Sequence, residues 1–262
     1  MANFGRSILN NALLTPAKTR RWMKPLTFTS NMYLSVGAPW EIYRVQSTTS
    51  TRITDYYTKG GDIGVYSTLL ALIPDYDVGF TIFTADGSAA NVAALLSNMV
   101  ADTFGVALEK AAKMQAVGKF AGSYAAANGT NSSVVISASS DTFGLTVQRW
   151  TSEGSDMFAN IALTQGISST SSLQVEVRLV PTGLQEVDEA TGMTSVAFRA
   201  VFGFQGTPSG NVFDLNCATW TTVDALAYAG LSIDQFIFQV DGDGKVMGLS
   251  LPALKAELLS SL

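Results

Sequence analysis

Hydrophobic positions in the first third of the chain alternate between helical and extended spacing. Four of them recur at helical intervals in residues 2–22, where Pro16 separates two expected short helices: Phe4, Ile8, Leu9 and Leu13. Four later runs are rich in β-branched and aromatic residues and predict strands: 38–45, 52–59, 65–73 and 78–85. Gly60 and Gly61 are expected to interrupt the second strand, and residues 74–77 to form a turn. The near-continuous hydrophobicity of the last two strands favours burial of both of their faces.

The strongest helical pattern follows, in residues 86–115. It is rich in Ala and Leu, and Ser88 stands where an N-cap is expected. Its apolar stripe is interpreted as core packing: Val92, Leu95, Leu96 and Met99.

From residue 117 the spacing changes to a period of two. Eight short runs carry it: 118–126, 132–139, 143–150, 157–164, 173–180, 194–204, 234–240 and 245–251. We therefore predict an α+β fold in two parts. An α+β region with an antiparallel sheet occupies residues 1–116, and an antiparallel, lipocalin-like β-barrel of about eight strands occupies 117–262. A barrel of that size can hold one small ligand.

Composition excludes several kinds of site. The chain has no histidine and a single cysteine, Cys217, so Ser–His–Asp triads, histidine metal sites, multi-cysteine zinc sites and internal disulfides are excluded. The turn at 240–245 fails as a calcium loop, because Pro252 stands where a bidentate Glu is required. We predict neither a metal nor a cofactor. The net charge of −5 without a basic cluster argues against nucleic acid as a partner.

Targeting signals are not evident in the sequence. The first 14 residues show no apolar core followed by a cleavage site. No apolar run is expected to reach the roughly 18 residues that a membrane span requires. We therefore expect a cytoplasmic protein without a membrane partner.

Six stretches of the chain carry a family resemblance: 4–30, 36–44, 57–85, 122–124, 143–150 and 231–244. They resemble the carboxy-terminal part of the β-lactamase and penicillin-binding-protein-like serine hydrolases, most closely fungal β-lactamase-related proteins that append a β-rich domain. The likeness spans nearly the whole chain but about half of such a hydrolase. In "YTKGGDIG", Lys59, Gly60 and Gly61 match the family's Lys/His-x-Gly element. The resemblance implies that the lysine holds an anionic substrate group and that the glycines allow close approach of the substrate.

The family's attacking serine has no counterpart here. It belongs to an S-x-x-K motif, and no lysine of this chain has a serine three residues before it. Thr15 precedes Lys18 at that spacing, but in a segment that matches a different part of the fold. Residues 33–35 fit Tyr-x-Asn/Ser formally, but well downstream of the family's position. The resemblance implies that the half with the S-x-x-K motif is absent and that this chain alone forms no acyl-enzyme through that serine.

Aromatic and ionisable residues concentrate around the matched strand. The candidate catalytic residues are Lys59 and Tyr57. The candidate substrate-binding residues are Trp40, Tyr43, Tyr56, Gly60, Gly61, Asp62 and Tyr66. One interpretation is a concave site in which rings stack on a ligand and Lys59 donates to an oxyanion or enolate. The other is a sheet edge that packs against the barrel or against another subunit.

Three functions stay open. The first is binding of an apolar small molecule and its non-covalent cyclisation or isomerisation, in a polyketide-type secondary-metabolite pathway and without a cofactor. The second is a non-catalytic binding or scaffold protein, and the third is a split serine hydrolase that needs a partner half. Strands left open by the absent half predict a homodimer or a barrel docked onto the sheet.

Overall fold

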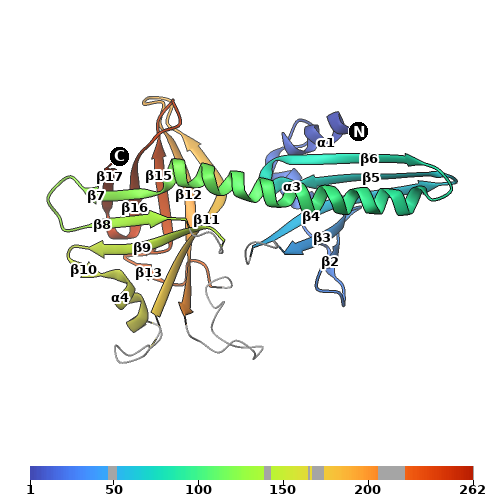
Figure 1. Ribbon diagram of the computed structural model, residues 1–262. Coiled ribbons are helices and arrows are strands. Elements are labelled where there is room, and N and C mark those ends of the chain that lie inside the picture. Colours follow the sequence, from blue (N-terminus) through green and yellow to red (C-terminus); the bar gives the residue numbers. More distant parts are fainter. Residues whose placement is uncertain (47–51, 139–142, 165, 167–173, 206–221, 262) are drawn as a thin grey trace. The chain divides into compact units, whose positions relative to one another are not determined.

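The fold consists of two compact units, Met1–Ala112 and Lys113–Leu262. The structure is a computed structural model, and it describes residues 1–46, 52–138, 143–164, 166, 174–205 and 222–261 (Figure 1). Both units consist mostly of antiparallel sheet with helices, which confirms the predicted α+β class. Cys217 and Trp220 lie outside the described residues.

The first unit contains two short N-terminal helices, a six-stranded antiparallel meander and most of the long helix α3 (Ala89–Phe120). The short helices are α1 (Ala2–Leu9) and α2 (Pro16–Trp22), and Thr15 caps α2 by accepting a hydrogen bond from the Lys18 amide. The strands pair in sequence order: β1 (Thr27–Phe28), β2 (Leu34–Val36), β3 (Glu41–Gln46), β4 (Ile53–Ile63), β5 (Tyr66–Ile73) and β6 (Val78–Ala85). The short helix η1 (Pro74–Tyr76) and a left-handed Asp77 form the predicted turn.

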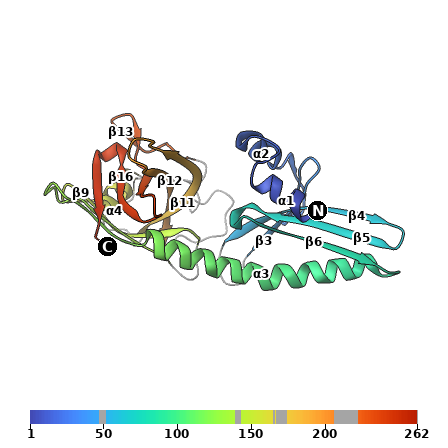
Figure 2. The ribbon, with the colours of Figure 1, turned by 90° about the horizontal axis from the view of Figure 1, so that it is seen from above.

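One face of this sheet packs against α1 and α2. The buried cluster there comprises Ile8, Met23, Trp40, Ile42, Leu70 and Leu72. The rings of Trp22 and Trp40 lie 5.0 Å apart between their centroids. In the view of Figure 2, α3 (Ala89–Phe120) lies on the other side of the sheet from α1 and α2. Successive side chains of β4 point to opposite faces of the sheet. One set therefore faces α1 and α2, and the other set faces α3.

Two predictions for these strands are wrong. Gly60 and Gly61 do not interrupt the second strand, because β4 continues through both of them, paired with β5, to Ile63. The last two strands are not alike in burial. Leu70 to Ile73 of β5 are buried, whereas Phe83 and Ala85 of β6 are exposed because β6 stands at the end of the sheet.

The residues of α3 that are buried are not the ones that the sequence predicted. Its small residues Ala89 and Ala93 are buried, but the apolar stripe is exposed: Val92, Leu95, Leu96 and Met99. The interpretation of this stripe as core was therefore wrong. The expectation on apolar runs was wrong as well, since α3 is long and apolar enough, by length and composition, to cross a membrane. A single helix of this kind is weak evidence, and the cytoplasmic location stays a prediction.

The second unit contains a closed ring of eight antiparallel strands. In pairing order they are β9 (Leu145–Ser152), β11 (Gln174–Val187), β12 (Thr194–Gln205), β15 (Gln235–Val240), β16 (Val246–Leu251), β17 (Ala256–Ser260), β7 (Gly122–Ala126) and β8 (Ser133–Ser137). The pairing of β8 with β9 closes the ring. Short strands lie outside it: β10 (Ser155–Asp156), β13 (Ala227–Tyr228) and β14 (Leu231–Ser232). The finer likeness to a lipocalin stays a prediction.

Large side chains fill the inside of this ring. The largest fully buried ones include Tyr124, Trp150, Phe202, Phe236 and Phe238. Aromatic rings contact one another there, with centroids of Trp150 and Phe236 5.0 Å apart. Among the described residues the ring therefore encloses a packed core.

Two of the eight predicted strand runs contain helix instead. Met157–Thr164 forms α4, whose Met157 and Ile161 are buried one helical turn apart. Residues 118–120 belong to the end of α3, and the strand begins only at Gly122. Both runs are short, apolar and rich in Ala, so their periodicity alone does not distinguish a buried helix from a strand.

Candidate functional site

The strand β4 is longer than its neighbour β3, and this leaves part of its edge open. The register joins Glu41 of β3 to Thr58 of β4 and ends there. On the other side, β5 pairs with β4 as far as Ile63. Residues 59–63 are therefore paired on one side alone among the described strands. Backbone N–H and C=O groups at such an edge can bind the polar atoms of a ligand.

An ion pair lies at the beginning of this open edge. The Nζ atom of Lys59 is 2.7 Å from Oε1 of Glu41 and also donates to the Gly60 carbonyl at 3.0 Å. The two side chains are 46% and 43% exposed, so the pair is open to solvent and to ligands. A lysine ammonium has three N–H donors. Two have these acceptors, and the third can donate to a ligand oxygen.

An aromatic hollow of about 280 Å³ adjoins Lys59 on the side of α1 and α2. Its lining includes Phe4 and Trp22 from the helices, Trp40 before β3, and Leu69 and Leu70 of β5. Among the described residues, the buried Nε1 of Trp40 has no hydrogen-bond partner. The hollow thus combines apolar rings with one ammonium group, which suits an apolar ligand that carries an oxygen acceptor.

A second cavity of about 350 Å³ lies on the opposite side of the sheet, beside α3. The sheet contributes Tyr43 of β3 and alternate residues of β4 and β5, and the helix contributes small residues. The lining includes Tyr56, Thr58, Gly60, Asp62, Ser67, Leu69 and Ala71 from the strands, and Ala90, Ala93, Ala94, Ser97 and Ala101 from the helix. Gly60 and Leu69 line both cavities, so the open edge separates them.

The structure divides the predicted site residues between these two faces. Lys59 and Trp40 lie at the aromatic hollow. The cavity beside α3 is lined by Tyr43, Tyr56 and Asp62. Gly60 lies between the two groups and belongs to both. The sequence placed all of them in one site, whereas the pleat of β4 sends successive side chains to opposite faces.

The other predicted residues line neither of these two cavities. Tyr57 packs edge-on against Trp40, with 6.2 Å between ring centroids. Gly61 belongs to the open edge, and a Cβ added there would lie 3.2 Å from the Thr68 hydroxyl. Tyr66 is exposed and belongs to the lining of neither cavity.

Burial raises the pKa of two tyrosines of this region. Desolvation raises the pKa of Tyr56 and of Tyr57 above the usual tyrosine range, and the nearby carboxylates Asp102 and Asp55 add to it respectively. A tyrosine with a raised pKa is a hydrogen-bond donor at neutral pH and a poor base. The groups of this neighbourhood that could act as bases are therefore carboxylates, and Glu41 is the one in contact with Lys59.

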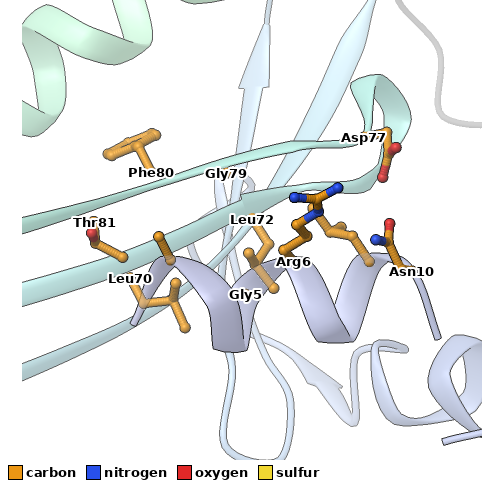
Figure 3. Close-up of a pocket in the computed structure, with 11 residues that line it drawn as sticks. Gly5, Arg6, Asn10, Leu70, Leu72, Asp77, Gly79, Phe80 and Thr81 are labelled. Atoms are coloured by element: carbon orange, nitrogen blue, oxygen red, sulfur yellow. The ribbon is translucent and has the colours of Figure 1, made fainter. Parts of the chain in front are cut away.

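A third hollow, of about 250 Å³, lies between α1 and the strands β5 and β6. Figure 3 shows Arg6 and Asn10 of α1 on one side of it, with Leu72, Gly79 and Thr81 on the strands. Gly79 permits close packing here, because an added Cβ would lie 2.7 Å from the Ala71 carbonyl oxygen. This hollow lies at the sheet end that β6 forms.

The acidic side chains between β11 and β12 belong to no metal site among the described residues. Glu186, Asp188 and Glu189 are exposed at the turn between β11 and β12. The Thr191 hydroxyl and the Ala190 amide donate to Asp188 and lower the pKa of that carboxyl. Among the described residues there is no group of three or more Asp, Glu, His or Cys side chains arranged to hold a metal ion. Cofactor independence stays a prediction.

Sequence reasoning gave no role to Glu41 and did not include the lining from α1 and α2. Glu41 was noticeable only as an ionisable neighbour of Trp40, since its contact with Lys59 depends on the register of β3 and β4. Phe4 was predicted only as an apolar position of the first helix, and Trp22 had no assigned contact. Their position beside Lys59 requires the tertiary fold.

Comparisons with known proteins identify the family of this chain. A sequence model of the family described as Beta-lactamase-like-like, C-terminal domain, matches residues 112–261. The chain is similar to the Beta-lactamase-like protein of Arthroderma benhamiae, at 28% identity over 98% of this chain and 46% of that protein. It is also similar to "Probable hydrolase clz13" of Cochliobolus lunatus, at 25% identity over 95% of this chain and 41% of that protein.

A third relative has the same relation to the chain. It is "Probable hydrolase M10" of a Phoma species, at 24% identity over 90% of this chain and 40% of that protein. The chain thus spans less than half the length of each of these relatives. No solved structure matches the chain.

Proposed function

For this chain, which belongs to the family described as Beta-lactamase-like-like, C-terminal domain, we propose that the open edge at Lys59 binds an apolar small molecule that carries at least one carbonyl or carboxylate oxygen. The observation that supports this most is the position of the half-exposed Lys59 ammonium beside an aromatic hollow of about 280 Å³. The third N–H of Lys59 donates to the ligand oxygen, and Trp22 and Trp40 contact its apolar part.

The proposed reaction is a cyclisation or isomerisation without a covalent intermediate, as would suit a polyketide-type substrate in a secondary-metabolite pathway. The Glu41 carboxylate removes a proton from the carbon next to the carbonyl. The electron pair of that C–H bond moves to the carbonyl oxygen, where Lys59 stabilises the enolate. Return of the proton at another carbon completes an isomerisation. Attack of the enolate carbon on a second carbonyl of the same ligand forms the new C–C bond of a cyclisation, and the new alkoxide takes the proton.

Direct contact between Lys59 and Glu41 supports this division of roles. At 2.7 Å they form a pair of opposite charge, so a ligand oxygen near Lys59 brings its adjacent carbon close to Glu41. No serine stands three residues before any lysine of this chain. A mechanism without attachment to the protein is the one that these residues support.

Ligand binding is tested with 2-naphthoate, an aromatic carboxylate of suitable size. Calorimetric titration of the purified chain should give a 1:1 complex, and intact-mass spectrometry of the mixture should give the unmodified protein mass. Absence of binding, or a stable adduct on the protein, would refute the proposal.

The lengths of the relatives favour a second candidate function. The chain spans 40–46% of three relatives, two of which carry the word hydrolase in their names. In this alternative, Lys59 to Ile63 form the substrate-binding edge of a serine hydrolase whose nucleophile lies on another polypeptide. A fluorophosphonate that labels activated serines should then label the complementing polypeptide only in the presence of this chain.

A further inference from the structure

Two buried hydroxyl groups in the lining of the cavity beside α3 have no hydrogen-bond partner. They belong to Tyr56 of β4 and Ser67 of β5, which are 5% and 6% exposed. Among the described residues neither side-chain oxygen makes a hydrogen bond, since the Thr84 hydroxyl donates to the backbone carbonyl of Ser67 and not to its side chain. Buried polar groups usually have partners, so a pair of unpaired hydroxyls in one cavity points to a ligand that supplies them.

Small residues on both walls keep this cavity open. The wall formed by α3 includes Ala90, Ala93, Ala94, Ser97 and Ala101. On the facing strand β4, Gly60 has no side chain to fill the space, and about 350 Å³ stays free. The floor is apolar, with Leu69 and Ala71 of β5. An aliphatic chain is the kind of molecule that such walls can bury.

The two hydroxyls lie towards opposite ends of this space. Ser67 pairs with Asp62 of β4, whereas Tyr56 lies on the same face of β4 roughly 20 Å before Asp62 along the strand. The Tyr56 hydroxyl lies beside Gly105 of α3, where an added Cβ would be 3.1 Å from it. At this end the cavity meets a further hollow of about 250 Å³, whose lining also includes Tyr56. The free space is therefore elongated, with one unpaired hydroxyl towards each end.

The charges around this space favour a neutral ligand. Asp62 lies at the end that contains Ser67, and Asp102 and Glu109 line the further hollow at the other end. No lysine or arginine is among the described residues that line either space. A carboxylate on the ligand would meet like charges here without a cation. Burial raises the pKa of Tyr56, so its hydroxyl is a hydrogen-bond donor at neutral pH.

We propose that the cavity beside α3 binds a linear aliphatic molecule with a neutral oxygen at each end, such as an aliphatic diol. One ligand hydroxyl accepts a hydrogen bond from Ser67 and donates to the Asp62 carboxylate, and the other accepts from Tyr56. The chain between them contacts Leu69 and the small residues of α3. This site lies on the opposite face of the sheet from the aromatic hollow at Lys59, and it does not depend on the function proposed for that hollow.

The test uses two probes of equal chain length that differ in charge. Calorimetric titration of the full chain with 1,10-decanediol should give a 1:1 complex. Decanedioate, which has a carboxylate at each end, should bind at least about tenfold more weakly, because both of its ends meet acidic residues. Saturating 2-naphthoate should leave the affinity for the diol unchanged, since it is expected in the hollow on the other face.

Variants that lack one hydroxyl identify the site. Tyr56→Phe and Ser67→Ala should each weaken diol binding about five- to tenfold. Neither should lower the free energy of unfolding of the ligand-free protein, because the deleted hydroxyls have no partner there. A purely structural role would instead lower it. The matched control is Tyr33→Phe, which changes an exposed tyrosine before β2 and should bind the diol like the wild type.

Four results would overturn the proposal. They are no binding of the diol, binding of decanedioate as tight as that of the diol, displacement of the diol by 2-naphthoate, and unchanged affinity in Tyr56→Phe or in Ser67→Ala.

Discussion

The ammonium group of Lys59 contacts the carboxylate of Glu41 at 2.7 Å, at the first residue of β3 and where β4 extends beyond its pairing with β3. The pair is about half exposed, so it contributes little to stability. Its position matters more than its energy, because it lies at the beginning of the unpaired edge and beside the aromatic hollow.

Lys59 is predicted to determine the affinity for aromatic carboxylates. Lys59→Met removes the donor and should raise the Kd for 2-naphthoate about 10- to 100-fold, the usual contribution of a charge-assisted hydrogen bond. Lys59→Arg should retain more of the affinity. Lys18→Met, at an exposed position of α2, serves as the control and should bind like the wild type. Equal binding by Lys59→Met and the wild type would show that the Lys59 ammonium group does not contact the ligand.

Gly79 is predicted to be required for the packing of β6 on β5. Gly79→Ala places a Cβ 2.7 Å from the Ala71 carbonyl oxygen and 2.8 Å from Leu72 Cδ2, so it should lower the free energy of unfolding by about 1–3 kcal/mol. Gly87→Ala meets no atom within 4 Å and should change it by less than about 0.5 kcal/mol. Urea denaturation of the two variants makes the comparison. A Gly79→Ala variant as stable as Gly87→Ala would show that β6 does not pack as described.

The protein is predicted to lose stability at alkaline pH, because Tyr124 is buried. Burial raises the pKa of Tyr124 to about 12, while its hydroxyl donates to the Phe120 carbonyl. The unfolded tyrosine has a pKa near 10, so between these two values the folded state binds the proton that the unfolded state has lost. This contribution to stability is fully present below about pH 10 and falls by about 1.4 kcal/mol per pH unit up to about pH 12.

The control is Tyr124→Phe, which has no proton to lose. It should cost about 1 kcal/mol at neutral pH through the lost hydrogen bond. Its stability should then fall less steeply than that of the wild type between pH 10 and 12, as followed by denaturant titration at each pH. Parallel curves for the two proteins would refute a buried, protonated Tyr124.

The sequence was sufficient for most of the strands and for the fold class. Period-two alternation is a local signal, and Phe198, Ala200 and Phe202 of β12 are buried on one face as it predicts. The turn at residues 74–77 also follows from local chemistry, because Pro74 and a left-handed Asp77 suit it. Local rules failed at Met157–Thr164, where a short apolar run fits a helix as well as a strand.

The site was predicted less completely, for a tertiary reason. Lys59 and Trp40 were selected from the sequence and do lie at one hollow. The separation of Tyr56 from Lys59 follows from the pleat of β4, and the contact of Glu41 with Lys59 follows from the register. Exposure of Leu95 and Met99 was not predictable from helical spacing alone, since that pattern shows which face of a helix is apolar but not what covers it.

Proton exchange is the most direct test of the proposed chemistry. The purified chain is incubated in D₂O with 2-tetralone, an apolar ketone with acidic protons next to its carbonyl, and deuterium in the ketone is followed by mass spectrometry. The account predicts exchange above the rate in buffer, lost in Glu41→Gln, reduced about tenfold or more in Lys59→Met, and unchanged in Lys18→Met. Exchange no faster than in buffer, or equally fast in Glu41→Gln, would contradict it.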